Sequence, residues 1–79
     1  MKHRQMYMRY CKDYGCWLKA EGDYARAMDH GESFNLRLGK KLWVPCILRW
    51  AGQRLWYVEI EPYKVKLNLR INEIYEIES

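Results

Sequence analysis

The stretch "KVKLNLRI", residues 64–71, alternates strictly between polar and apolar side chains. In a β-strand successive side chains point to opposite faces, so this period of two predicts a strand with one buried face. The apolar residues form the predicted inner row: Val65, Leu67, Leu69 and Ile71. The polar residues form the outer row: Lys64, Lys66, Asn68 and Arg70. We therefore expect a half-buried strand whose outer face is basic.

Four other segments show strand patterns: 14–21, 34–38, 42–50 and 55–60. Turn signals at 38–41 and 51–54 separate the middle three. Short connections of this kind join antiparallel neighbours, so they predict two hairpins that share residues 42–50. A third turn signal, at 61–64, leads into the final strand.

Alternation also assigns side chains to the core. Phe34, Leu36 and Leu38 share one predicted inner row, and Trp56, Val58 and Ile60 form the larger apolar row of the next hairpin. Residues 42–50 are apolar on both faces and contain Pro45. Proline cannot donate to a ladder, so this segment is expected at a sheet edge or at a bulge.

Two regions allow alternative structures. Residues 1–13 form either a short helix, because Tyr7, Tyr10 and Tyr14 have helical spacing, or an extended arm. Within 22–33, either Asp23 caps a single helical turn or residues 24–28 form a short strand. The strand is the favoured alternative.

About five short strands in a chain of 79 residues favour a single domain that is mostly β. Closure into a small antiparallel barrel would remove the exposed sheet edges, and the strand lengths predict an SH3-like barrel over residues 14–71. A basic N-terminal arm, residues 1–13, precedes it, and an acidic end, residues 72–79, follows it.

Several short motifs occur in a fixed order along this predicted barrel: Tyr14–Gly15, Gly31–Glu32, Trp43–Val44, Trp56–Tyr57 and Leu69–Arg70–Ile71. Their order resembles a small β-barrel family of unknown function found in Gram-positive bacteria, their phages and mobile elements. The chain departs from that pattern at 46–49, where it reads Cys-Ile-Leu-Arg instead of ending in Arg-Ile. The motifs are structural, so the resemblance implies a barrel and a phage or mobile-element context, and no activity.

The net charge of +4 is arranged in blocks, with basic residues concentrated in 34–70 and acidic residues in 21–33 and 73–78. A basic face attracts nucleic acid or an acidic protein surface. Trp, Tyr and Arg also dominate the hot spots of protein interfaces. The candidate partner-binding residues combine both features: Lys40, Lys41, Trp43, Arg49, Trp50, Arg54, Lys64, Lys66 and Arg70. Trp17 and Trp56 are expected in the core, whereas the pattern does not decide which of Trp43 and Trp50 is exposed.

Catalysis, metals and cofactors are not expected. The three cysteines and two histidines lack the spacing of a zinc site, and the isolated glycines form no phosphate loop. Asp29–His30 beside Cys16 is the one candidate for a nucleophilic site, and a surface turn explains that pair better. Three irregularly spaced cysteines indicate free thiols in a reducing compartment.

The sequence thus predicts a small non-enzymatic binding module. The favoured interpretation is an accessory or inhibitor protein of a phage or mobile element that docks on a host protein, as a monomer or weak homodimer. The alternative is a nucleic-acid-binding barrel that contacts phosphates through the same basic face. The residues "MKHRQMYMRY" at 1–10 lack a signal-peptide core, and no apolar run could span a membrane, so a cytoplasmic location is expected.

Overall fold

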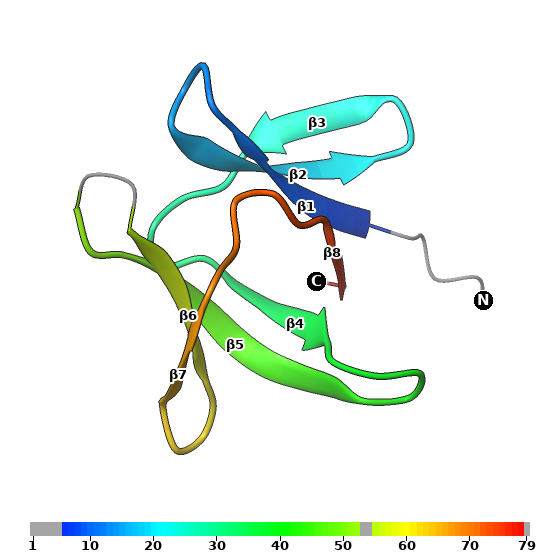
Figure 1. Cartoon of the computed structure of the whole chain (residues 1–79). Helices are drawn as coiled ribbons and strands as arrows, with labels where there is room; N and C mark the ends of the chain where they lie inside the picture. Colours follow the sequence, from blue (N-terminus) through cyan, green and yellow to red (C-terminus); the bar gives the residue numbers. More distant parts are fainter. Residues whose placement is uncertain (1–5, 53–54, 79) are drawn as a thin grey trace.

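A computed structural model describes residues 6–52 and 55–78, which form one antiparallel sheet of eight strands (Figure 1). The strands are β1 (Met6–Cys11), β2 (Cys16–Glu21), β3 (Tyr24–Ala27), β4 (Ser33–Arg37), β5 (Trp43–Trp50), β6 (Trp56–Ile60), β7 (Val65–Asn68) and β8 (Tyr75–Glu78). Their order across the sheet is β3-β2-β1-β8-β4-β5-β6-β7. No helix occurs in these ranges, so the prediction of a mostly β, antiparallel fold is confirmed.

The count of about five strands was too low because both ends of the chain belong to the sheet. The N-terminal alternatives resolve as β1, where Met6, Met8 and Tyr10 alternate with more exposed residues. β1 pairs with β8, and β8 also pairs with β4, so both are interior strands. The favoured short strand in 22–33 is present as β3.

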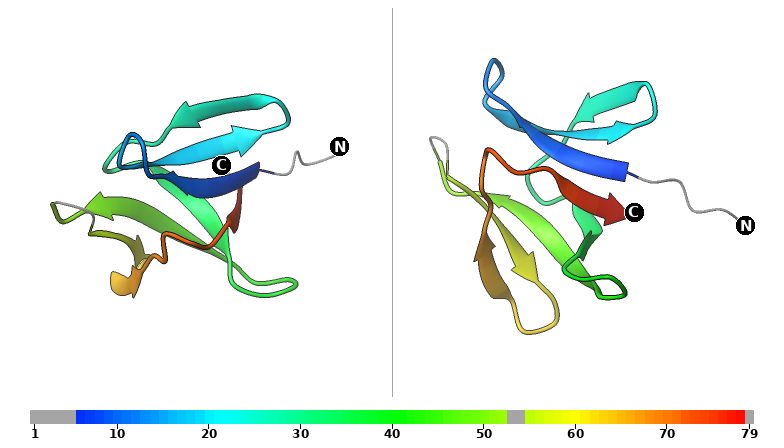
Figure 2. Two further views of the ribbon diagram at one scale, coloured as in Figure 1. Left: turned by 45° about the horizontal axis from the view of Figure 1, so that its top comes forward. Right: turned by 45° about the vertical axis from the view of Figure 1, so that its right-hand side comes forward.

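The sheet curls strongly without closing into a barrel, and within the described residues β3 and β7 are its edges (Figure 2). The segment 28–32 crosses from one half of the sheet to the other. The Met28 N–H donates to the Trp17 carbonyl at 2.8 Å, and the Gly31 N–H donates to the Leu48 carbonyl at 2.7 Å. Gly31 has a φ of 91°, a left-handed conformation that glycine adopts without a steric penalty. The crossing segment thus ties β2 to β5.

The core lies on the concave face, and its buried side chains come from six strands and the crossing segment: Met8, Tyr10, Trp17, Met28, Phe34, Leu36, Cys46, Leu48, Val58 and Ile77. Trp17 is fully buried between two tyrosine rings, with centroid distances of 5.6 Å to Tyr10 and 5.7 Å to Tyr75. Buried aromatic rings of this size supply much of the apolar area of so small a core.

The predicted inner rows are confirmed in their centres and wrong at their ends. Trp56 and Ile60 pack against the core around the fully buried Val58, as the alternation of 55–60 predicts. In contrast, Leu38 lies beyond the end of β4 and is 49% exposed. Val65 begins β7 and Ile71 lies beyond the end of β7 at Asn68, and both are also exposed.

Pro45 was expected at an edge or a bulge, but it lies in an interior strand with regular register. It pairs with Asn35 of β4 between two regular pairs, so the ladder has no bulge there. The Pro45 carbonyl accepts the Glu61 N–H at 2.9 Å, one residue beyond the last β5–β6 pair, Cys46↔Ile60. The N–H and C=O of a strand residue point to the same side, so an N–H at position 45 would face β6. Proline lacks this N–H, and position 45 is just where the β5–β6 pairing ends.

Candidate partner-binding surface

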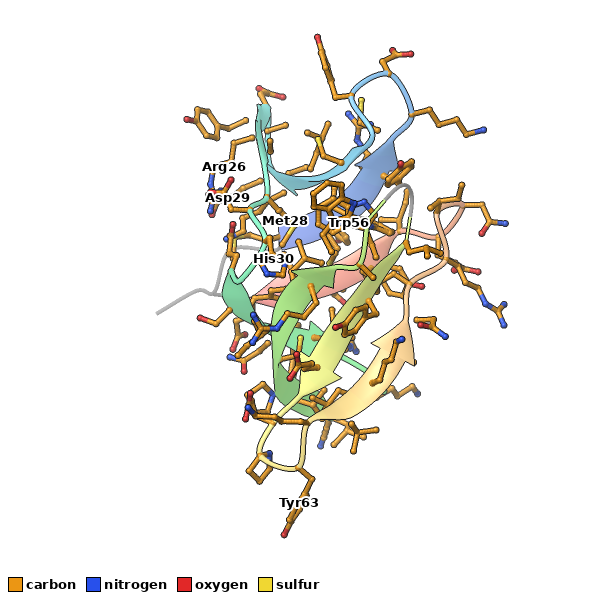
Figure 3. All side chains as sticks on the ribbon, turned by 90° about the vertical axis from the view of Figure 1, so that its left-hand side faces the viewer. Arg26, Met28, Asp29, His30, Trp56 and Tyr63 are labelled. Atoms are coloured by element: carbon orange, nitrogen blue, oxygen red, sulfur yellow. The ribbon has the colours of Figure 1, made fainter. Side chains whose placement is uncertain are left out.

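The predicted site residues divide between the two ends of β5. Trp43 begins this strand and Trp50 ends it, which separates them by about 24 Å at 3.4 Å per residue. Lys40 and Lys41 are exposed in the turn before Trp43. Lys64 lies in the β6–β7 turn beside Tyr63, and Figure 3 shows Tyr63 at one end of the molecule, away from Trp56 and His30. The structure therefore does not bring all nine predicted residues together; Arg54 lies outside the described residues.

Arg49 and Trp50 are consecutive in β5, so their side chains project from opposite faces. Arg49 lies on the convex face, where its Nε donates to Glu59 Oε1 at 2.7 Å. Trp50 lies on the concave side opposite Trp56, with ring centroids 6.1 Å apart, and remains 51% exposed. The predicted aromatic-arginine edge is thus split, and the charge of Arg49 is balanced within the sheet.

Two of the other predicted residues, Lys66 and Arg70, lie on β7 or just beyond it, and Lys66 projects with Glu59 from the convex face, opposite to Trp50. The Leu69 N–H donates to the Trp56 carbonyl at 3.2 Å, which continues the β6–β7 pairing and brings Arg70 to the level of Leu55. Lys66 precedes Arg70 by four residues and is opposite Glu59. We use the name Trp50 surface for Trp50 on the concave face together with Leu55, Tyr57, Lys66, Asn68 and Arg70, of which Tyr57, Lys66 and Asn68 project from the convex face.

A pocket of about 160 Å³ opens beside Leu55 and β7. Its described lining residues are Ala51, Leu55, Trp56, Tyr57, Lys66, Asn68 and Leu69. None of these described residues is acidic, and among them Lys66 alone is charged. Leu55 is 63% exposed at its rim. The pocket therefore combines apolar walls with a cation.

The ammonium group of Lys66 lies 4.5 Å from the centre of the Tyr57 ring, a cation–π contact. Glu59 is directly opposite Lys66 in the ladder, but its carboxylate accepts the Arg49 Nε–H instead. Within the described residues Lys64, Lys66 and Arg70 form no ion pair. Their charge is therefore available to a partner.

The crossing segment positions the backbone of Trp50. The Trp50 N–H donates to His30 Nδ1 at 2.9 Å, and His30 belongs to the turn that Gly31 completes. Glu32 anchors this turn through ion pairs to Lys19 at 2.8 Å and Arg26 at 2.7 Å. Figure 3 shows Arg26, Asp29 and His30 along this one side of the molecule.

The Glu32 carboxyl has an unusual acidity. Partial burial works to raise its pKa, but hydrogen bonds from Arg26 and Lys19 and from the Asp29 N–H outweigh this effect and lower the pKa to about 2. The carboxylate therefore stays ionised under all ordinary conditions. An electrostatic cluster thus holds the segment on which Trp50 depends.

The other predicted residues lie in a different environment. Trp43 is half-buried, and the Arg37 guanidinium lies 5.8 Å from its ring centre. Arg37 also pairs with Glu76 of β8. These contacts give Trp43 a structural role on the convex face, while Lys40 and Lys41 remain exposed beside it. The pocket lined by Leu55 and Lys66 includes no residue of this end.

The thiols are poorly suited to nucleophilic chemistry. Burial raises the pKa of the Cys46 thiol to about 12, so it stays protonated near neutral pH. Burial, together with the neighbouring Cys11, also raises the pKa of the Cys16 thiol. Among residues 6–52 and 55–78, no group of three or more His, Cys, Asp or Glu side chains could hold a metal ion.

Sequence reasoning missed three members of this region. Leu55 was assigned to an outer row without a function, although an exposed leucine beside a turn is a detectable signal. Tyr57 was overlooked because its role depends on Lys66, which the register brings close. His30 contacts Trp50 across 20 residues of chain, and no local pattern indicates this bond.

Comparisons with known proteins give no relative. No protein-family model, no curated protein and no solved structure matches the chain. The described residues contain no helix of the length and apolarity that a membrane crossing requires.

Proposed function

We propose that this chain is a small non-enzymatic binding module that docks on an acidic surface of a protein partner through the Trp50 surface. The family resemblance of the sequence suggests a phage or mobile-element origin and thus a host protein as the partner. The proposal assigns the main contacts to Trp50, Lys66 and Arg70, and it leaves Lys40, Lys41 and Lys64 outside the interface.

One observation carries this proposal: an exposed leucine lies beside a cation that has no ion-pair partner in the described chain. Leu55 is 63% exposed and lines a pocket with Lys66 that has no acidic lining among the described residues, while Trp50, on the concave face, is 51% exposed. Large apolar side chains together with unpaired cations are typical of interface hot spots rather than of ordinary surface. The surface therefore suits a partner with both apolar and acidic groups.

A protein suits this surface better than a nucleic acid does. Single-stranded nucleic acid stacks its bases on several open aromatic rings along a basic groove. Here Trp56 packs against the core and Lys66 covers the Tyr57 ring. In addition, the lysines at the Trp43 end are about 24 Å from Trp50. Exposed Leu55 offers nothing to a phosphate backbone and is well suited to an apolar side chain.

The test compares two exposed aromatic residues at opposite ends of the molecule. The partner is captured from a nuclease-treated lysate of a Gram-positive host, purified, and titrated with each variant. Trp50→Ala should weaken binding at least tenfold, because a hot-spot tryptophan contributes more than about 1.4 kcal/mol. Tyr63→Ala, which removes an 86% exposed ring, should change the affinity less than twofold. Equal affinities for the two variants, or loss of capture after nuclease treatment, would contradict the proposal.

Charge reversal separates the basic residues of the two ends. Lys64→Glu and Lys66→Glu each replace an exposed side chain, so each should cost less than about 1 kcal/mol of stability even with loss of the Tyr57 contact. Lys66→Glu should weaken partner binding at least tenfold, whereas Lys64→Glu should have little effect. Thermal unfolding and titration calorimetry measure the two quantities. An equal loss from both variants would instead indicate a diffuse basic face.

A further inference from the structure

We propose that the partner contributes an extended acidic segment that pairs with β7 as a ninth strand of the sheet. This inference rests on the proposed function and specifies how the same surface binds. It concerns the backbone of β7, which the proposed function does not use.

The backbone of β7 has an open side. Leu69 donates its N–H to Trp56 of β6, and because strand residues alternate in direction, Leu67 and Val65 also face β6. The N–H and C=O groups of Lys66 and Asn68 therefore point away from the sheet, and no described residue bonds them. An added strand would satisfy these groups, as in other complexes formed by strand addition.

The open stretch has a defined end. The next outward group along the chain is the Arg70 N–H, and it donates to the Tyr75 hydroxyl at 2.9 Å. This bond closes the edge just beyond Asn68. Pairing is thus limited to a short segment beside the Trp50 surface, which places the added strand next to the pocket that Lys66 and Asn68 line.

At the opposite edge of the sheet, a charged side chain covers one outward backbone group of β3. On β3 the outward carbonyl of Ala27 accepts a hydrogen bond from Arg26 at 3.0 Å, and Glu32 holds that guanidinium in place. Charged side chains that cover an edge are a common protection against unwanted pairing. Lys66 could protect β7 in the same way, but its ammonium group lies over the Tyr57 ring instead.

Charge identifies the occupant. Lys66 and Arg70 flank the open backbone and have no ion-pair partner in the described chain. A second copy of β7 would place these cations against one another, and like charges in opposing strands are destabilising. An extended segment rich in Asp or Glu would instead gain both backbone bonds and charge pairing.

The test selects displayed random twelve-residue peptides on the full chain, and the best enriched peptide is then synthesised as the probe. The enriched peptides should be acidic. Asn68→Pro removes an N–H that points away from β6. It should therefore lower the affinity for the probe peptide at least tenfold while leaving the β6–β7 ladder intact. Asn68→Ala keeps this N–H and should bind within threefold of the original. Ala25→Pro makes the same backbone change on β3 and should have no effect.

A second measurement needs no substitution. Hydrogen exchange on the original chain should show that the probe slows exchange of the Lys66 and Asn68 amides, and that the Ala25 amide exchanges as before. Peptides without acidic bias, equal losses from Asn68→Pro and Asn68→Ala, or unprotected β7 amides would overturn the inference. If the probe is sensitive to Trp50→Ala but not to Asn68→Pro, the proposed function stands and strand addition fails. If neither Trp50→Ala nor Asn68→Pro changes the affinity for the probe, both the proposed function and the strand addition fail.

Discussion

Leu48→Asp should leave the chain without a cooperative folded state. Leu48 is fully buried, opposite the equally buried Val58, and no described cation lies against this part of the core. A lone carboxylate there must either lose its hydration or take up a proton, at a cost of several kcal/mol. Single domains have only about 5–15 kcal/mol of stability, and a small core lies at the lower end. Circular dichroism during heating should show no sigmoidal transition.

Leu48 also carries backbone bonds that make its position a junction of the fold. Its carbonyl accepts the Gly31 N–H, and its own N–H donates to the Glu32 carbonyl at 2.9 Å. Val65→Asp is the matched control, because Val65 belongs to the row predicted from sequence to be buried yet is 55% exposed. It should cost less than about 1 kcal/mol. A cooperative transition for Leu48→Asp, or unfolding by Val65→Asp, would show that the core is placed elsewhere.

Acid should destabilise the protein through Glu32 in particular. Its pKa falls from an ordinary value of 4.5 to about 2 in the folded state, so the stabilisation is complete above pH 4.5 and is lost as the pH falls toward 2. This difference corresponds to at most about 3 kcal/mol, and solvent around the half-exposed Arg26 reduces it to about 2 kcal/mol. Urea unfolding at a series of pH values between 2 and 6 measures this loss.

Substitution separates Glu32 from the other carboxylates. Glu32→Gln should lower stability at pH 6 by about 2 kcal/mol and flatten the profile between pH 4.5 and 2. Glu73→Gln changes an exposed carboxylate that forms no ion pair in the described residues, so it should retain the original profile. If the profile of Glu32→Gln is as steep as that of the original chain, other acidic groups cause the acid sensitivity.

Alternation of side chains predicts the centres of the strands well. The rows around Leu36 and Val58 are buried as the period of two requires, and the two hairpins that share β5 have the predicted partners. These features depend on local pattern alone. For β1 the same pattern was present, but the tyrosines at 7, 10 and 14 also fit a helix, and only pairing with β2 and β8 decides between them.

The arrangement of the site depends on long-range register, which no local pattern contains. Whether Arg49 is available depends on Glu59, ten residues away across a hairpin, and the structure pairs the two. The choice between Trp43 and Trp50 likewise depends on distant residues, since Arg37 and β4 cover the first. The sequence therefore identifies candidate residues for the proposed interface, but the register decides which of them lie together.

The place of β8 in the sheet has a consequence for the order in which the protein folds during synthesis. β8 joins the half-sheet β3-β2-β1 to the half-sheet β4-β5-β6-β7, and β1 and β4 do not contact each other directly. Until the ribosome has delivered residues 75–78, each half exposes an unpaired strand with a buried-type inner row. Such nascent edges attract other chains, and chaperones recognise them for the same reason. β8 follows the other seven strands along the chain, so the two half-sheets are joined only after all of those strands have emerged.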